Sequence, residues 1–235
     1  LPEWVDKVIH IDCDTMIMSS LEPLWNIDMK DKIVAGAYDC IGDSYKKEIG
    51  MKPDDTYISA GNIMLNLAEI RRRKLEENFK EFIQSHRQLS FADQPVLNAC
   101  TANEDKLLIP LNYNAYSIVF YLNYKNVKRA KKASRYYTEA QVLDAVSNPC
   151  IVHFTTCFMD GTRPWIENNN HPMIKQYLDY KQKSEWADTP LWKDNRSAVK
   201  KLGGRMFNIL PQGFVAGSIG IVHDKIVPAL HKIKK

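Results

Sequence analysis

The chain has 235 residues, of which 45% are hydrophobic and 26% charged, the composition of an ordinary globular protein. This length can form a full core in one large domain or two small ones. No stretch reaches the roughly 20 apolar residues of a membrane-spanning helix. The five cysteines lack Cys-x-x-Cys spacing, which argues against a structural zinc site and favours a reducing compartment.

The formal net charge of +4 is unevenly distributed along the chain. From Lys193 to the end, nine Lys or Arg residues stand against two Asp, and the rest of the chain has a net charge of −3. Apolar residues are interleaved with the basic ones in this final segment. We therefore expect a main body at residues 1–190 and a basic amphipathic segment at 191–235 that contacts an anionic lipid surface. A solvated tail is the alternative.

The first predicted strand, residues 7–11, leads directly into Asp12 and Asp14. Residues i and i+2 of a strand point to the same side, so the two carboxylates repel each other unless a cation lies between them. Asp-x-Asp at the end of a buried strand is thus a candidate site for a divalent metal and, through it, a phosphate. Asp is also common in the turns that end strands, and this alternative stays open here.

Further apolar runs predict strands at residues 32–38, 57–67, 107–110 and 149–154. Helices are predicted to end near residue 86, to begin within 91–99 and to span 138–146. This mixture of strands and helices predicts an α/β fold with a mostly parallel sheet.

In such sheets ligands bind beyond the carboxyl ends of the strands. Three predicted strands carry polar or small residues there, namely Asp12 and Asp14, Ser59-Ala60-Gly61, and His153. A lone strand histidine is usually structural. Two carboxylates and one imidazole together, however, suit Mn²⁺ or Mg²⁺ with open positions for phosphate oxygens.

The order of these pieces resembles glycosyltransferase family 8. The residues that carry the resemblance are Asp12-Cys13-Asp14, Ser59-Ala60-Gly61, Asp93-Gln94, His153-Phe154 and Gly161-Thr162-Arg163-Pro164-Trp165. The resemblance covers residues 1 to about 165. It implies a retaining enzyme of the GT-A fold, related to glycogenin and to bacterial lipopolysaccharide galactosyl- and glucosyltransferases. Such an enzyme moves a hexose from a UDP-sugar to a carbohydrate or glycolipid acceptor.

The resemblance also implies roles for individual residues. Asp12, Asp14 and His153 would bind Mn²⁺ (or Mg²⁺), which bridges the diphosphate of the donor. Asp93 would hydrogen-bond the donor sugar, and Gln94 would lie on the face of the anomeric carbon where a nucleophile is expected. The substrate-binding residues would be Asp39, Ser59, Ala60, Gly61, Gly161 and Arg163. The basic C-terminal segment would attach a cytoplasmic enzyme to the inner face of the membrane.

The chain departs from the family pattern at several points. Ser59 stands where the family often has asparagine, and Arg163 where it usually has lysine. The strand-helix units that bind uridine in the family, upstream of Asp-x-Asp, are absent from the chain. We therefore expect residues 1–190 to be the C-terminal portion of a GT-A catalytic domain.

Two other interpretations remain open. A phosphatase of the haloacid dehalogenase type also opens with an apolar strand and Asp-x-Asp, but it needs Thr or Val where this chain has Met16. A degenerate transferase that only holds a sugar nucleotide is the second. Nucleic-acid binding is not expected, because the basic residues of the C-terminal segment form no stacking series with aromatic residues.

Overall fold

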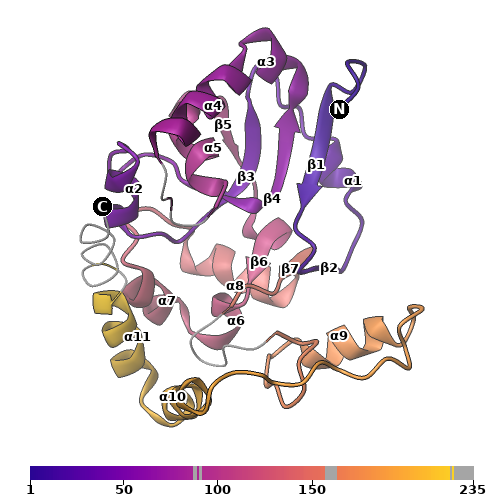
Figure 1. The fold of residues 1–235 in the computed structure, drawn as a ribbon, viewed down its shortest axis with the longest axis vertical. Helices are drawn as coiled ribbons and strands as arrows, with labels where there is room; N and C mark the ends of the chain where they lie inside the picture. The colour runs from indigo at the N-terminus through magenta and orange to yellow at the C-terminus, as the bar shows by residue number, and fades with distance from the viewer. Residues whose placement is uncertain (87–88, 90–91, 157–162, 223, 225–235) are drawn as a thin grey trace.

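The computed structural model describes residues 1–86, 89, 92–156, 163–222 and 224. Its named strands form two sheets. The larger sheet contains, in spatial order, β1 (Lys7–Ile11), β4 (Ile58–Asn66), β3 (Val34–Tyr38) and β5 (Lys106–Leu108) (Figure 1). The smaller sheet contains β2 (Thr15–Ile17), β7 (Ile151–His153) and β6 (Ala115–Tyr116).

The predicted mixed α/β fold is confirmed, but the prediction of a mostly parallel sheet is wrong. Among the described residues β4 runs antiparallel to both β1 and β3, and β2 antiparallel to β7; only the β3–β5 and β6–β7 pairs are parallel. The prediction failed because continuous apolar runs are typical of parallel strands, which are covered on both faces. Here an antiparallel pair, β3 and β4, is covered on both faces, so its apolar run reports burial and not strand direction.

The two faces of the larger sheet pack against different layers. On one face, Leu97 of α5 (Gln94–Cys100) packs against Val34, Ile58 and Ile63. On the other face, residues such as Ala35 and Met64 join the main core. The alternation of neighbouring residues between the two layers follows from the period of two in a strand. The sheet is therefore the middle layer of the molecule.

The remaining helices are mostly short; those up to α8 lie between strands along the chain, and α9, α10 and α11 follow the last named strand. They are α1 (Glu22–Trp25), α2 (Asp43–Glu48), α3 (Leu67–Arg72), α4 (Leu75–Ser85), η1 (Asn103–Asp105), η2 (Leu111–Asn114), α6 (Ile118–Tyr121), α7 (Tyr124–Lys131), α8 (Glu139–Ser147), α9 (Ile174–Lys181), α10 (Ala198–Ile209) and α11 (Gln212–Ile221). The capping box predicted at the start of α8 is present, because Thr138 and Gln141 exchange hydrogen bonds there.

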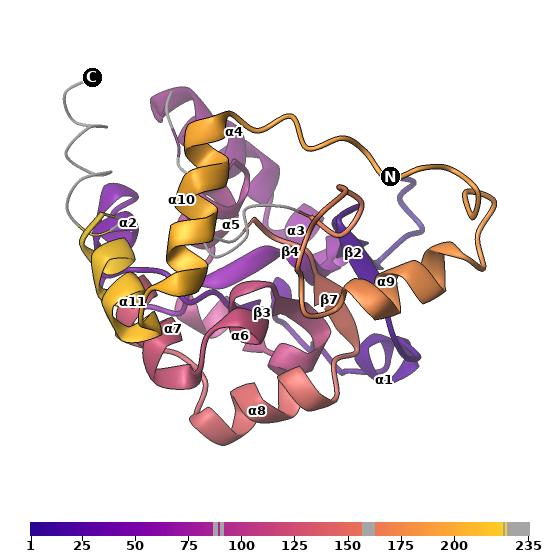
Figure 2. The same ribbon diagram turned by 90° about the horizontal axis from the view of Figure 1, so that it is seen from below.

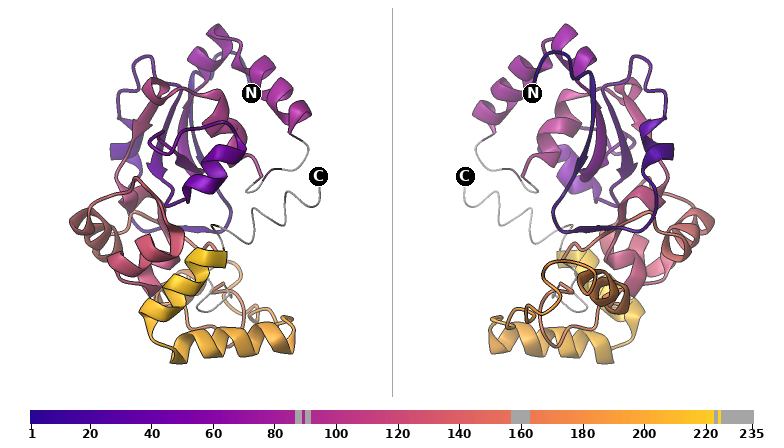
Figure 3. Two further views of the ribbon diagram at one scale, coloured as in Figure 1. Left: turned by 90° about the vertical axis from the view of Figure 1, so that its left-hand side faces the viewer. Right: turned by 90° about the vertical axis from the view of Figure 1, so that its right-hand side faces the viewer.

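The last two helices differ in how they meet the rest of the molecule. α11 packs against α7, and its Val215, Ala216 and Ile219 belong to the main core. The two helices approach so closely that a Cβ on Gly220 would lie 2.4 Å from the Arg129 carbonyl oxygen. α10 lies at the end of the molecule remote from α3 and α4 (Figures 1 and 3). Figure 2 shows α10 from below, with α9 on the same side.

α10 presents an apolar stripe to solvent. Val199, Leu202, Met206 and Ile209 follow helical spacing and are 80%, 60%, 51% and 83% exposed. Among the described residues, no helix combines the length and apolar character needed to cross a bilayer.

Candidate functional site

Asp12 and Asp14 lie where the chain passes from the larger sheet to the smaller one. Asp12 follows β1 directly, and its backbone N–H donates to the Gly61 carbonyl at 2.7 Å. Asp14 precedes β2, and its carbonyl accepts from Phe154 N–H at 2.8 Å. Backbone pairing to β4 and β7 therefore fixes both ends of the Asp-x-Asp turn.

His153 ends β7 opposite Thr15 of β2, which brings it to the two carboxylates. Its Nε2 lies 3.1 Å from Asp14 Oδ1 and 3.6 Å from Asp12 Oδ2. One ligand atom from each of the three residues lies within 4.8 Å of the other two. The histidine side chain is buried, whereas Asp12 is 43% exposed, so the cluster is open on one side. The three residues are assembled as predicted, and the donor set of two carboxylates and one imidazole fits Mn²⁺ or Mg²⁺.

Gly61 makes room for this cluster. A Cβ at this position would lie 2.3 Å from His153 Cε1 and 2.9 Å from Asp12 Oδ2. Both distances are below contact distance, so no other residue fits unless the histidine and the carboxylate move. The absence of a side chain at Gly61 thus lets the β4 backbone lie directly against two candidate metal ligands.

Arg163 adds positive charge to the cluster. Its Nη2 lies 3.0 Å from Asp14 Oδ2, and its guanidinium lies over the Trp165 ring. The hydrogen bond with His153 lowers the pKa of Asp14, and the charges of His153 and Arg163 lower it further against the effect of burial. Asp14 is therefore held as a carboxylate, the form that binds a metal. The predicted Gly161 lies outside the described residues.

A second group of predicted residues meets beside the first. Gln94 Nε2 donates to Asp39 Oδ2 at 2.9 Å, and Ala60 N–H donates to Gln94 Oε1 at 3.0 Å. Because Ala60 and Gly61 are neighbours in β4, this Gln94–Asp39 pair adjoins the Asp12–Asp14–His153 cluster. Both ends of the buried Gln94 amide are engaged, which fixes its orientation. Ser59, the preceding residue of β4, is buried.

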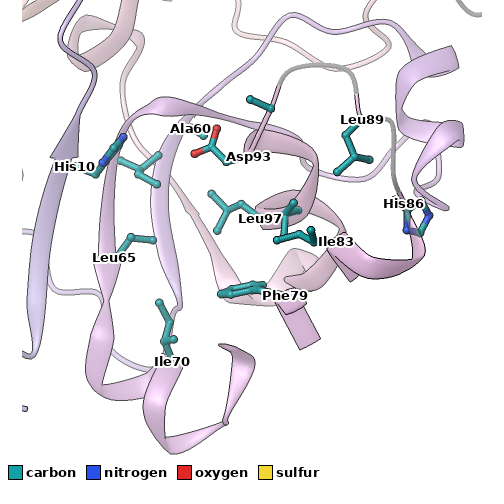
Figure 4. Close-up of a pocket in the computed structure, with 13 residues that line it drawn as sticks. His10, Ala60, Leu65, Ile70, Phe79, Ile83, His86, Leu89, Asp93 and Leu97 are labelled. Atoms are coloured by element: carbon teal, nitrogen blue, oxygen red, sulfur yellow. The ribbon is translucent and has the colours of Figure 1, made fainter. Parts of the chain in front are cut away.

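Asp93 lies at the start of α5, as predicted, and faces a groove. Its carboxylate makes no capping hydrogen bond to the α5 backbone. The groove, of about 600 Å³, is lined mainly by apolar side chains of β4, α4 and α5, with Phe79, Ile83 and Leu97 among them (Figure 4). Ala60 and Asp93 line it as well, so this apolar groove adjoins the Gln94–Asp39 pair.

Several residues that support the site were missed by sequence analysis. Asn98, one turn along α5 from Gln94, exchanges two hydrogen bonds with the backbone of Ile58 and so attaches α5 to β4. The hydroxyls of Tyr137 and Tyr116 accept from the backbone N–H groups of Tyr38 and Cys40, on either side of Asp39. Burial raises the pKa of both phenols. No motif marks these residues, because their roles depend on contacts with distant parts of the chain.

Solved structures with a similar fold are glycosyltransferases. The galactosyltransferase LgtC, in complex with donor and acceptor sugar analogs, aligns with a TM-score of 0.59 and 19% identity over 76% of this chain and 61% of its own. GlyE of Streptococcus pneumoniae TIGR4 aligns with a TM-score of 0.53 and 17% identity, over 79% of this chain and 41% of its own. The predicted GT-A fold is confirmed.

Sequence comparison defines the family within this fold. Residues 1–169 match glycosyl transferase family 8, and the chain belongs to that family. It is 26% identical to general stress protein A of Bacillus subtilis over 187 residues, 78% of this chain. It is 25% identical to lipopolysaccharide glucosyltransferase WaaO of Escherichia coli over 205 residues, 81% of this chain. The matched regions span 61% and 53% of these two relatives.

Proposed function

We propose that the chain carries the metal-binding and sugar-binding part of a retaining glycosyltransferase. The enzyme would move a hexose from a UDP-sugar to a carbohydrate or glycolipid acceptor. Membership of family 8 and the similarity to a lipopolysaccharide glucosyltransferase support this reaction class. The observation that carries the proposal is the Asp12–Asp14–His153 cluster beside the Gln94–Asp39 pair.

Asp12, Asp14 and His153 would hold Mn²⁺ or Mg²⁺. The bound ion supplies electrostatic stabilisation of the diphosphate leaving group. Arg163, now paired with Asp14 at 3.0 Å, is a second cation within reach of phosphate oxygens. A leaving group neutralised in this way needs no general acid, and none is assigned.

Gln94 and Asp93 would act at the sugar. Retention of configuration requires either a covalent intermediate or attack from the leaving-group face. An uncharged amide is a poor nucleophile, and both ends of the Gln94 amide are engaged by Asp39 and Ala60. We therefore infer front-face attack, in which Gln94 and Asp93 stabilise an oxocarbenium-like centre. Asp39, Ser59, Ala60, Gly61 and Gly161 would line the donor sites.

Two surfaces of the molecule support a glycolipid acceptor at a membrane. The apolar groove beside Asp93 suits the apolar part of a glycolipid. The exposed stripe of α10, with exposed Lys200 and Arg205 on the same helix, suits the surface of an anionic membrane. The enzyme would then work from the cytoplasm at the inner face of the membrane.

A screen of nucleotide sugars tests the reaction. Hydrolysis or transfer is measured for UDP-hexoses and for other nucleotide sugars, with added Mn²⁺ or Mg²⁺ and after chelation. We expect ion-dependent turnover of a UDP-hexose. In Asp12→Asn this turnover should fall at least 100-fold, because one of the two candidate metal-binding carboxylates is replaced by an uncharged amide. Metal-independent transfer by this variant would refute the metal role.

Membership of family 8 removes the phosphatase alternative. A protein that only holds a sugar nucleotide is the remaining candidate, because the Asp12–Asp14–His153 cluster would hold an ion and a diphosphate whether or not the sugar is then transferred. Calorimetric binding of UDP with Mn²⁺, in the absence of turnover of every donor tested, would support this candidate over the enzyme.

A further inference from the structure

His153 has two ring nitrogens, and the structure gives each a different neighbour. Nε2 faces the carboxylates of Asp12 and Asp14. Nδ1 lies 3.0 Å from the Oδ1 atom of Asn114, the last residue of η2. A neutral imidazole carries one proton, so the group beside Nδ1 decides whether Nε2 has a lone pair for a metal.

Asn62 of β4 contacts the same end of the Asn114 amide as the histidine does. Its Nδ2 donates to Asn114 Oδ1 at 2.8 Å. The same oxygen therefore faces both Asn62 and His153, and an amide oxygen can only accept. In the ion-free protein His153 Nε2 donates to Asp14. An ion at Nε2 would take the place of that proton, and the hydrogen bond with Asn114 then requires the one remaining ring proton to be on Nδ1.

The burial of these two asparagines needs a reason beyond packing. Asn62 is 1% exposed and Asn114 is fully buried. Within the described part of the chain, Asn62 Oδ1 and Asn114 Nδ2 have no hydrogen-bond partner. A buried polar atom without a partner is destabilising, and an apolar residue of similar size would avoid that cost. The pair is explained if the Asn114 oxygen serves His153.

We propose that Asn114, oriented by Asn62, is a positioning residue for the metal centre. It accepts the Nδ1–H of His153, which fixes the ring orientation and directs the Nε2 lone pair to the space between Asp12 and Asp14. Histidine ligands of metals generally donate their second ring N–H to such an acceptor, and its loss typically lowers metal affinity about 10–100-fold. The inference rests on the proposed metal site but not on any substrate.

Mn²⁺ binding to the purified protein, measured by electron paramagnetic resonance, tests the proposal without activity. Asn114→Leu removes the acceptor, and Asn114→Asp replaces it with a stronger one. Asn112→Leu is the matched control: Asn112 lies on the same η2, but its side chain donates to Asp144 and to the Asn148 carbonyl, remote from His153. Spin-echo modulation from ¹⁴N reports whether the imidazole coordinates the ion.

We expect Asn114→Leu to lose about 10–100-fold in Mn²⁺ affinity and to lose the ¹⁴N modulation. Asn114→Asp should retain both, and Asn112→Leu should match the wild type. Wild-type affinity and modulation in folded Asn114→Leu would overturn the proposal. If that variant does not fold, as judged by circular dichroism, Asn114→Asp decides: a tenfold loss of affinity there overturns it.

The failure of this inference is distinguishable from failure of the proposed function. If the wild type binds no divalent ion, the metal site itself is wrong. If the wild type binds Mn²⁺ with ¹⁴N modulation and the Asn114 variants bind it equally well, only the role of Asn114 is wrong.

Discussion

Gly61 lies directly against two candidate metal ligands, and a substitution there tests the need for a residue without a side chain. In Gly61→Ala the new methyl group would overlap the His153 ring and the Asp12 carboxylate. We expect destabilisation of about 1–3 kcal/mol from overpacking, together with at least a tenfold loss of Mn²⁺ affinity because two ligands are displaced. Urea denaturation and metal titration measure the two effects.

Gly203→Ala in α10 is the control for this change, because an added Cβ there meets no atom within 4 Å. Alanine also favours a helix over glycine, so the control should be as stable as the wild type or more so. Normal metal binding by Gly61→Ala would contradict the assigned geometry.

His171 predicts a pH dependence of stability. It is fully buried: its Nδ1 accepts from Met173 N–H, and its Nε2 faces Ser117 Oγ. Burial lowers the pKa of His171 to about 4, whereas an unfolded histidine titrates near 6.5. The unfolded state therefore binds the proton first, and the stabilisation present above pH ~6.5 is lost as the pH falls towards about 4. This contribution is about 3 kcal/mol.

Denaturant unfolding at pH values between 7 and 4 measures this effect. Wild type should lose stability steadily over that interval. His171→Gln cannot titrate, so its stability should start lower at pH 7 and fall less steeply. An equally steep fall in the variant would show that another group is responsible.

At the scale of the elements, α10 is the candidate membrane contact. Its exposed apolar stripe lies beside basic residues, so burial in a lipid headgroup layer and attraction to anionic lipids would act together. Wild type should sediment with vesicles containing phosphatidylglycerol, less so at high salt. Leu202→Glu should reduce the bound fraction several-fold.

The matched control for α10 is Leu143→Glu. Leu143 lies on α8 and is 58% exposed, close to the 60% of Leu202. Leu143→Glu adds the same negative charge as Leu202→Glu. Unchanged vesicle binding by Leu143→Glu would therefore show that a reduced binding of Leu202→Glu comes from its place on α10 and not from the added charge alone. Equal binding by Leu202→Glu and wild type would remove α10 from the proposed membrane surface.

The sequence predicted elements better than their pairing. The strand that ends in His153 and the capping box of α8 were predictable, because each depends on neighbours in the chain. The strand geometry assumed for Asp12 and Asp14 was wrong, because both residues lie in the turn between β1 and β2. The relative direction of paired strands was not predictable, because an apolar run indicates that a strand is buried and not how it pairs. The supporting roles of Asn98 and Asn114 at the site could not be predicted either, because each depends on a hydrogen bond to a residue 39 or more positions away in the chain.

At the scale of the whole molecule, the candidate metal centre joins the two sheets. Asp12 follows β1 of the larger sheet, whereas Asp14 and His153 adjoin the smaller one. The ion would bind mainly the folded state, because unfolding separates His153 from Asp12 and Asp14. We expect Mn²⁺ at 100 times its dissociation constant to add about 2.7 kcal/mol to the free energy of unfolding.

Thermal unfolding in increasing Mn²⁺ measures this stabilisation, and EDTA should reverse it. Asp14→Asn should remove most of the metal-dependent rise in Tm. A rise of the same size in this variant would place the ion elsewhere on the protein.

The packing of α11 into the core has a consequence for the α10 surface. Leu210 and Pro211 alone separate the two helices, and Val215, Ala216 and Ile219 hold α11 against α7. A bilayer touching α10 would therefore set the height and tilt of the reaction centre above the lipid. Acceptors would then be selected partly by how far their sugars project from the membrane.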